Sequence, residues 1–362
     1  MLKSILKTIP GLVVASLFLA CSQSDENQTV LPFIKGIYGN PGTLLDSGYS
    51  FDSLGVNAVF VRSISLNPEF YEAARDQGCR VYVEFPTLLG RNYVEENPEA
   101  WPINEEGEQS PAADWFMGVC PTNYDFREYR MTQLREILGN YEVDGIFLDY
   151  VHWHAQFETP NPILPETCFC NNCTDLFEAE YNLDIPGAEI SEKASWILKE
   201  KDMEWRKWRS DILNGWVRDL GEEVKNLRPD ALLGIFYCSW YEDDHDNALY
   251  RILGIDVAEF ADLADVLSPM LFHMMKDRPV EWVGEYLAWL SSHISDEVSQ
   301  SPKIWPIVQA HNNPGIISPE EFRQAMIEGS KSPSTGIMMF SDQSLLQDQK
   351  KIEVMKELYS VW

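Results

Sequence analysis

The sequence predicts a single (β/α)8 barrel, and three observations support this fold class. Eight short apolar segments alternate along the 362 residues with stretches of helical periodicity. Most of these segments are apolar throughout rather than at every second residue, which is typical of strands buried on both faces of a parallel sheet. No internal repeat and no linker divides the chain, whose length suits one barrel of ~200 to more than 400 residues. We therefore expect one barrel domain over residues 32–362.

The predicted strands are short apolar runs that end in polar or aromatic residues. In chain order they span residues 33–38, 56–62, 80–85, 143–150, 232–238, 266–272, 304–310 and 336–341. Apolar residues at helical spacing predict helices at 124–141, 279–294 and, after a Ser318 cap, 319–329. Four tryptophans belong to a further long helical region and are expected to pack in the core: Trp196, Trp205, Trp208 and Trp216.

Two of the connections are much longer than the others. Residues 86–122 follow the third predicted strand, and residues 151–190 follow the fourth. Loops that follow the strands of a (β/α)8 barrel lie on its carboxyl-terminal face, where such barrels carry out their chemistry. We therefore expect both long loops to border the functional site.

Residues 1–20 predict an export signal. Lys3 and Lys7 precede an apolar run over residues 9–20, which is too short to span a bilayer. The run ends in Ala20-Cys21 and resembles a bacterial lipobox, with Phe18 in place of its usual Leu. The resemblance implies that Cys21 becomes a lipid-modified first residue, followed by a tether over residues 21–31. The protein is then exported and lipid-anchored, at the outer membrane, and contacts the membrane only through the lipid. An ordinary cleaved signal is the alternative.

The composition excludes several classes of protein. Hydrophobic residues make up 45% and charged residues 23%, which rules out a disordered, collagen-like or disulfide-knotted chain. The formal charge is −29, and it becomes −31 once the two signal lysines are removed. A field of this sign repels phosphate backbones, so nucleic acid is not an expected partner.

Four of the cysteines have the spacing of a metal site. Cys168, Cys170 and Cys173 lie within six residues, and Cys120 begins the helical segment that follows the other long loop. Four thiolates can surround Zn²⁺ tetrahedrally, and adjacent loops on one barrel face can bring them together. Such a closed site leaves no position for water, so the zinc would be structural. Disulfides are the alternative in an exported protein.

The region around these cysteines resembles a known family. Cys120 before Pro121, then a helix, a strand and the C-x-C-x-x-C cluster, is similar to the zinc-bearing loops of glycoside hydrolase family 42 β-galactosidases. The similar stretch covers residues 119–177, roughly a sixth of the chain. The resemblance implies structural zinc beside the active site, and no organic cofactor is expected.

The ends of the predicted strands carry the mixture of side chains that a sugar needs. Flat aromatic rings can cover the C–H faces of a sugar, and polar groups can hold its hydroxyls. We expect substrate contacts from residues at or just after the strand ends and from one tryptophan before Cys120: Tyr38, Arg62, Trp115, Tyr150, His152, Trp153, His154, Tyr237, Trp240, His273, Gln309 and His311.

Asp149 is the first candidate for catalysis. It ends the segment Asp-Gly-Ile-Phe-Leu-Asp-Tyr at residues 144–150, which is similar to the fourth strand of several glycoside hydrolase barrels with the pattern D-G-I-x-L-D-Y. We expect Asp149 to act as nucleophile or base, with a second carboxyl as acid. Glu242, after strand five, ranks slightly ahead of Glu84 and Asp342 for that role. A buried Asp149 that only fixes a loop is the alternative, and residues 242–246 equally fit a solvated loop or a cation site.

The chain departs from two hydrolase families. Family 42 enzymes carry Asn-Glu at the end of strand four and a Glu at strand seven, whereas Asp149-Tyr150 and Gln309 stand at these ends here. Family 18 chitinases are also similar in strand four, but Phe147 and Val151 replace their second Asp and catalytic Glu. The specific activity of either family is therefore not expected.

The sequence thus predicts a glycoside hydrolase that cleaves an oligo- or polysaccharide through carboxyl groups. A carbohydrate-binding lipoprotein that has lost catalysis is one alternative, because strand seven lacks a carboxylate. A metal-dependent esterase or deacetylase that uses His152, His154 and Asp149 is another.

Overall fold

The structure is a computed structural model that describes residues 31–294 and 301–362. The chain divides into a unit of residues 1–32 and a unit of residues 33–362. The expected signal sequence, Cys21 and most of the tether lie outside the described residues. Within the described ranges, no helix combines the length and apolar character that crossing a membrane requires.

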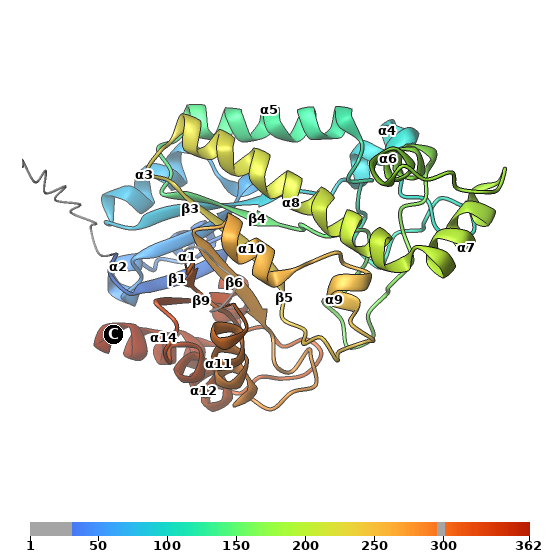
Figure 1. The fold of residues 1–362 in the computed structure, drawn as a ribbon. Helices are drawn as coiled ribbons and strands as arrows, with labels where there is room; N and C mark the ends of the chain where they lie inside the picture. Colours follow the sequence, from blue (N-terminus) through green and yellow to red (C-terminus); the bar gives the residue numbers. More distant parts are fainter. Residues whose placement is uncertain (1–30, 295–300) are drawn as a thin grey trace, which may run out of the picture. The chain divides into compact units, whose positions relative to one another are not determined.

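Residues 33–362 form the expected (β/α)8, or TIM, barrel, as Figure 1 shows. The parallel strands follow the order β5-β4-β3-β2-β1-β9-β8-β6, and β6 closes the sheet by pairing with β5. Their bounds are β1 Ile34–Gly39, β2 Ala58–Arg62, β3 Arg80–Pro86, β4 Gly145–Asp149, β5 Leu232–Cys238, β6 Val266–Leu271, β7 Lys303–Ile304, β8 Ile307–Gln309 and β9 Gly336–Phe340.

The seventh strand of the barrel is divided into β7 and β8, which both pair with β6. Pro306 lies between the two pieces, and proline has no backbone N–H to donate to a neighbouring strand. The predicted strand at residues 304–310 is therefore present but interrupted.

Helices connect the strands and cover the barrel. Their bounds are α1 Gly42–Asp46, α2 Phe51–Leu54, α3 Pro68–Asp76, α4 Arg91–Glu96, α5 Tyr124–Asn140, α6 Asn171–Tyr181, α7 Ile190–Glu200, α8 Asp202–Leu227, α9 Ala248–Arg251, α10 Val257–Leu263, α11 Trp282–Ile294, α12 Pro319–Gly329, α13 Asp342–Leu346 and α14 Gln349–Val361. Ser318 caps α12 as expected, since its hydroxyl accepts a hydrogen bond from the Glu321 N–H at 3.1 Å. Helices α5 and α8 lie side by side in Figure 1, joined by ion pairs such as Arg127–Asp219.

The interior of the barrel is filled by aromatic rings. Phe60 stacks on Tyr82 with 4.9 Å between ring centroids, and Phe147 stacks on Trp305 at 5.9 Å. Gly234 makes room for this packing, because a Cβ on it would lie 2.3 Å from the Phe147 ring. The barrel is therefore a packed core rather than a channel, and a ligand can enter only at its rim.

The tryptophans of α8 pack as the sequence predicts. Trp205, Trp208 and Trp216 are buried, and the first two stack with 4.8 Å between ring centroids. Trp196, on α7, is half-buried. These rings stabilise the helical layer and do not line the central pocket.

The two long loops after β3 and β4 are present and contact each other. Asn104 and Thr167 form a β-bridge between them, and the Phe169 N–H donates to the Ile103 carbonyl at 2.8 Å. The loops are therefore joined into one structure that borders the carboxyl-terminal face of the barrel.

Candidate functional site

A pocket of about 610 Å³ lies at the carboxyl ends of the barrel strands. Its lining comes from the ends of β1, β2, β3, β4, β6 and β9 and from the loops that follow several of them. The lining residues are Tyr38, Arg62, Ser63, Ile64, Glu84, Pro86, Leu89, Trp115, Asp149, Tyr150, Glu158, Met270, Phe272, Met275, His311, Asn313 and Phe340. The pocket thus combines aromatic faces with carboxyl groups.

Asp149 is buried at the floor of this pocket and is held by two hydrogen bonds. Its Oδ2 accepts from the Tyr38 hydroxyl at 2.9 Å, and its Oδ1 accepts from the backbone N–H of Tyr150 at 2.8 Å. Tyr150 has φ of 56°, and this left-handed turn ends the strand. Burial raises the pKa of Asp149 to about 6, although both hydrogen bonds favour the ionised form.

Glu84 is the second buried carboxyl of the pocket. It lies on β3, opposite Arg62 of β2 in the parallel register. Burial raises the pKa of Glu84 to about 8, and the charge of Asp149 adds to the rise. The Arg62 guanidinium acts in the other direction. Near neutral pH, Asp149 is therefore the ionised member of the pair and Glu84 is the protonated one.

Glu158 is a third pocket carboxyl, and the sequence gives no signal for it. It lies in the irregular part of the loop after β4 and is half-buried. Burial raises the pKa of Glu158 to about 7, with a further contribution from Asp149, while Lys276 and Arg62 lower it. A loop glutamate of this kind has no strand end or motif to mark it.

Five of the residues predicted to contact substrate do line the pocket: Tyr38, Arg62, Trp115, Tyr150 and His311. Trp115 is 43% exposed and contacts Tyr150 edge to face, with 5.8 Å between ring centroids. Burial lowers the pKa of His311 to about 4, so its imidazole is neutral at pH 7. The Arg62 guanidinium carbon lies 5.7 Å from the Phe340 ring centre.

Two of the predicted carboxyls lie elsewhere. Glu242 is exposed and lines a separate pocket of about 440 Å³. In the same loop after β5, Asp244 forms an ion pair with Arg278 at 2.6 Å. Asp342 accepts hydrogen bonds from the Asn40 N–H at 2.9 Å and from the hydroxyl of Thr43 on α1. The structure therefore brings Glu84, and not Glu242 or Asp342, into the pocket of Asp149.

The two histidines after β4 are buried outside the pocket lining. His152 Nδ1 lies 2.8 Å from the Trp153 carbonyl oxygen. His154 Nδ1 accepts from the Gly118 N–H at 3.1 Å, and its Nε2 donates to the Pro111 carbonyl at 2.9 Å. These side chains fix the loop backbone. They do not converge with Asp149 on a metal site, because among the described residues only four cysteines form a metal-ligand group.

The other predicted contacts are also buried outside the lining. Trp153 donates its indole N–H to the Arg209 carbonyl at 3.1 Å, and the ammonium of Lys276 lies 4.6 Å from the Trp240 ring centre. Three further residues are buried away from the pocket surface: Tyr237, His273 and Gln309. Strand-end position alone did not distinguish side chains that face the pocket from those that pack behind it.

The four cysteines of the long loops form a cluster. The sulfurs of Cys120, Cys168, Cys170 and Cys173 all lie within 4.8 Å of one another. The Cys120 Sγ is 3.5 Å from that of Cys173 and 3.8 Å from that of Cys170, too far for disulfides. Sulfurs about 3.8 Å apart match a tetrahedral zinc site with Zn–S distances of ~2.3 Å. The donor set therefore fits a metal such as zinc.

Backbone and side-chain contacts hold the cluster in place. The Ile103 N–H donates to the Cys168 Sγ at 3.2 Å, and the Trp216 indole donates to the Pro121 carbonyl at 2.8 Å. The cluster thus joins the loop after β3, the loop after β4 and the layer of α8. It also fixes the loop that carries Trp115.

The barrel shares its fold with glycoside hydrolases of known structure. The PgaB (BpsB) glycoside hydrolase domain from Bordetella bronchiseptica superposes with a TM-score of 0.67 and 14% identity, over 91% of this chain and 100% of that domain. The β-galactosidase from Marinomonas ef1 superposes with a TM-score of 0.65 and 10% identity, over 91% of this chain and 59% of that one. Gan42B, a GH42 β-galactosidase from G. stearothermophilus, superposes with a TM-score of 0.62 and 14% identity, over 91% of this chain and 57% of that one.

At these identities the likeness shows the shared fold. The chain spans the whole of the PgaB domain but under 60% of these two β-galactosidases. Neither a family model nor a curated protein matches the sequence.

Proposed function

We propose that the protein is a glycoside hydrolase that cleaves an oligo- or polysaccharide in its central pocket. The observation that carries this proposal is that two buried carboxyls, Asp149 and Glu84, line one pocket and that only Asp149 accepts hydrogen bonds from Tyr38 and the Tyr150 N–H. Burial raises both pKa values, to about 6 for Asp149 and about 8 for Glu84. Glycoside cleavage uses one ionised and one protonated carboxyl, and unequal pKa values assign the two roles. Asp149 is then the nucleophile or base, and Glu84 is the general acid.

The neighbouring side chains suit this chemistry. The Tyr38 hydroxyl and the Tyr150 N–H orient the carboxylate of Asp149 toward one position. Trp115 offers a partly exposed ring for the C–H face of a sugar, and the neutral imidazole of His311 can hydrogen-bond its hydroxyls. The likeness to glycoside hydrolase barrels supports the same class of reaction.

The test is a panel of p-nitrophenyl glycosides and defined oligosaccharides, assayed for aglycone release or new reducing ends. The Asp149→Asn variant should lose at least ~10³-fold in kcat while still folding and binding the glycan. Asp243→Asn is the matched control, because Asp243 is exposed and lines the separate pocket. Unchanged turnover in Asp149→Asn contradicts the assignment. Binding without turnover by the wild-type protein favours the carbohydrate-binding alternative.

We further propose that Cys120, Cys168, Cys170 and Cys173 hold a structural zinc ion. Four thiolates complete a tetrahedral shell, so the ion supplies cross-linking of the two long loops and no chemistry. The resemblance of residues 119–177 to the family 42 zinc loops supports this role.

The export and lipid anchoring expected from residues 1–21 also remain a proposal. Cys21→Ser should move the protein from the detergent-extracted membrane fraction to the soluble fraction, because the lipid is its only expected anchor. An unchanged membrane fraction would contradict it.

A further inference from the structure

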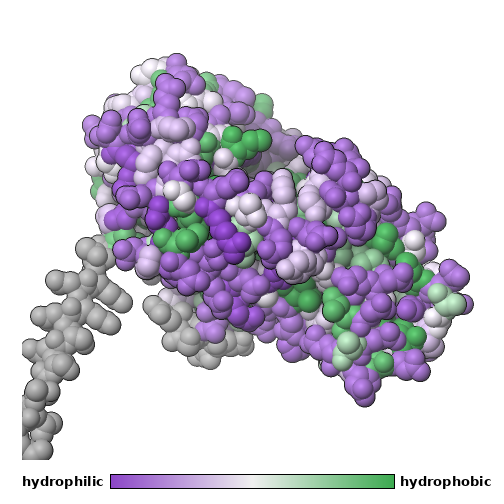
Figure 2. Space-filling model, turned by 90° about the horizontal axis from the view of Figure 1, so that it is seen from above, coloured by the Kyte–Doolittle hydropathy of each residue, from purple (hydrophilic) through white to green (hydrophobic). Residues whose placement is uncertain are grey.

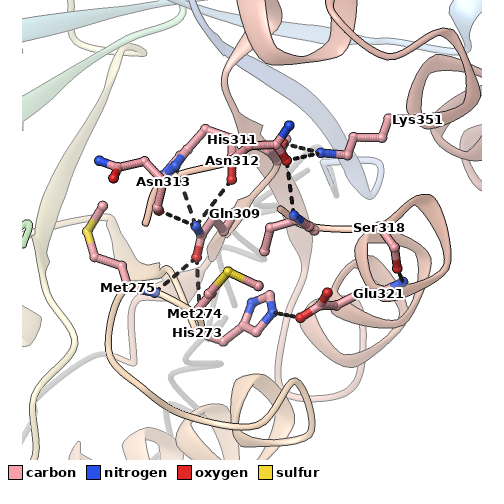
Figure 3. A network of polar contacts seen from close by, with 12 residues as sticks. His273, Met274, Met275, Gln309, His311, Asn312, Asn313, Ser318, Glu321 and Lys351 are labelled. Atoms are coloured by element: carbon pink, nitrogen blue, oxygen red, sulfur yellow. Dashed lines mark hydrogen bonds and ion pairs between the residues drawn. The ribbon is translucent and has the colours of Figure 1, made fainter. Parts of the chain in front are cut away.

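The end of the seventh strand carries a buried amide that joins two loops. The Oε1 of Gln309 accepts hydrogen bonds from the N–H groups of Met274 at 3.2 Å and Met275 at 3.4 Å, in the loop after β6. Its Nε2 donates to the carbonyls of His311 at 3.2 Å and Asn313 at 2.8 Å, in the loop after β8. The Nε2 also lies 3.4 Å from Nδ1 of His311. Figure 3 shows the Gln309 amide at the centre of these contacts.

Only an amide can make this set of contacts. These contacts require one side-chain atom that accepts two hydrogen bonds and another that donates two, whereas a carboxylate has no donor. Gln309 is fully buried, so backbone groups that lose their partner there would be costly. The position at the end of strand seven is therefore occupied by a structural amide rather than by a reacting group.

Both of these loops supply part of the pocket wall. Met275 comes from the loop after β6, and His311 and Asn313 come from the loop after β8. The second loop has another anchor in α14, since the buried ammonium of Lys351 donates to Asn312 Oδ1 at 3.0 Å. Because α14 fixes the loop after β8, the Gln309 amide determines the position of the loop after β6 relative to it.

We infer that Gln309 is a positioning residue, which holds the loops after β6 and β8 at the spacing that a bound glycan requires without touching the glycan. The inference rests on the proposed function. A sugar in the pocket would meet Met275 from one loop and His311 and Asn313 from the other. Loss of the amide contacts should therefore weaken binding more than it slows the chemistry at Asp149.

The sharpest test is Gln309→Glu, which keeps the size of the side chain. A protonated carboxyl can still accept from both N–H groups and donate once, whereas the ionised form would face the two carbonyl oxygens. The folded state therefore holds this proton more tightly than the unfolded state, and the variant loses stability as pH rises above ~4.

The expected result is a KM that depends on pH. The ratio of variant to wild-type KM should lie within ~3-fold at pH 5 and reach ~10-fold or more at pH 8, with kcat changed far less. Four titratable groups lie around the amide: His273, His311, Glu321 and Lys351. The uncharged variant Gln309→Met separates their titration from that of the new carboxyl, because it adds no charge beside them. The dissociation constant of a bound oligosaccharide gives the same ratio if the wild-type protein binds without hydrolysis, which separates this inference from the proposed function.

Two variants serve as controls. The half-buried Gln77 also accepts and donates through its amide, from the Phe51 N–H at 2.7 Å and to the Ala73 carbonyl at 3.1 Å, and it lies outside the pocket lining. Gln77→Glu should therefore lose stability with pH and leave KM unchanged. Gln309→Met should raise KM equally at all pH values. This variant tests the inference if Gln309→Glu does not fold at neutral pH. A KM ratio near one across the pH range for both Gln309 variants would overturn the inference.

Discussion

Asp149 and Glu84 show how burial sets the chemistry of single residues. Both carboxyls lie at the rim of a barrel whose interior is apolar, so neither is well solvated. The Tyr38 hydroxyl and the Tyr150 N–H donate hydrogen bonds to the Asp149 carboxylate, which offset part of the effect of burial and keep the pKa of Asp149 below that of Glu84. Two acidic side chains of similar intrinsic strength therefore acquire different pKa values from their surroundings.

Some of these residues could be predicted and others could not. Asp149 and Glu84 end continuous apolar runs, and in a parallel barrel such ends meet at one rim. Glu242 also follows a strand, but a run of charges in a loop has the same sequence whether the loop turns toward the pocket or away from it. Glu158 lies in irregular backbone, where sequence periodicity gives no direction.

At the same scale, Trp115 should bind substrate rather than catalyse its cleavage. Trp115→Ala should raise KM ~5–20-fold, which corresponds to about 1–2 kcal/mol, and leave kcat within ~3-fold. Steady-state kinetics measures both constants. Tyr124→Ala is the control, because Tyr124 is also an exposed aromatic residue and lies outside the pocket lining. An unchanged KM for Trp115→Ala would show that the ring only supports its loop.

At the scale of elements, the alternation of strands and helices was readable because buried parallel strands are apolar throughout. The interruption of the seventh strand was not predicted, although Pro306 stands at the break between β7 and β8. The meeting of Cys120 with the C-x-C-x-x-C cluster depends on two long loops that contact each other through backbone bonds. Spacing suggested this arrangement, and only the folded loops could establish it.

The cysteine cluster should hold about one zinc ion per chain in the purified protein. Cys173→Ser should lose the metal and lower Tm by several degrees, because it opens the junction between the two loops. Metal analysis and thermal unfolding measure these effects. Cys79→Ser is the control, since Cys79 is a buried cysteine outside the cluster. Oxidised thiols without zinc in the wild-type protein would contradict the proposed site.

At the scale of the whole molecule, the protein has a strongly acidic charge and a mainly hydrophilic face. The face in Figure 2 is mainly hydrophilic, and apolar residues appear on it in small separate patches. The chain has 57 acidic and 28 basic residues, so its field does not favour anionic polymers.

The buried carboxyls should cost the molecule stability. The pKa of Glu84 is raised to about 8 in the folded state, above the ~4.3 of an unfolded chain. The folded state therefore binds more protons between these values, and stability falls as pH rises through this window. Glu84→Gln should melt ~2–5 °C above the wild type at pH 8.5 and show no gain at pH 4. Glu353→Gln, at an exposed position on α14, should change neither value. A lower Tm for Glu84→Gln at pH 8.5 would contradict this account.

The pH dependence of kcat/KM tests the central claim most directly. Hydrolysis needs Asp149 ionised and Glu84 protonated, so the wild-type profile should be bell-shaped, with limbs near pH 6 and pH 8 that belong to the coupled pair. Glu84→Gln should remove the alkaline limb and lower the rate ~10²–10⁴-fold on a natural glycoside, but far less on an aryl glycoside whose leaving group needs no proton. An alkaline limb that persists in Glu84→Gln would contradict the assignment.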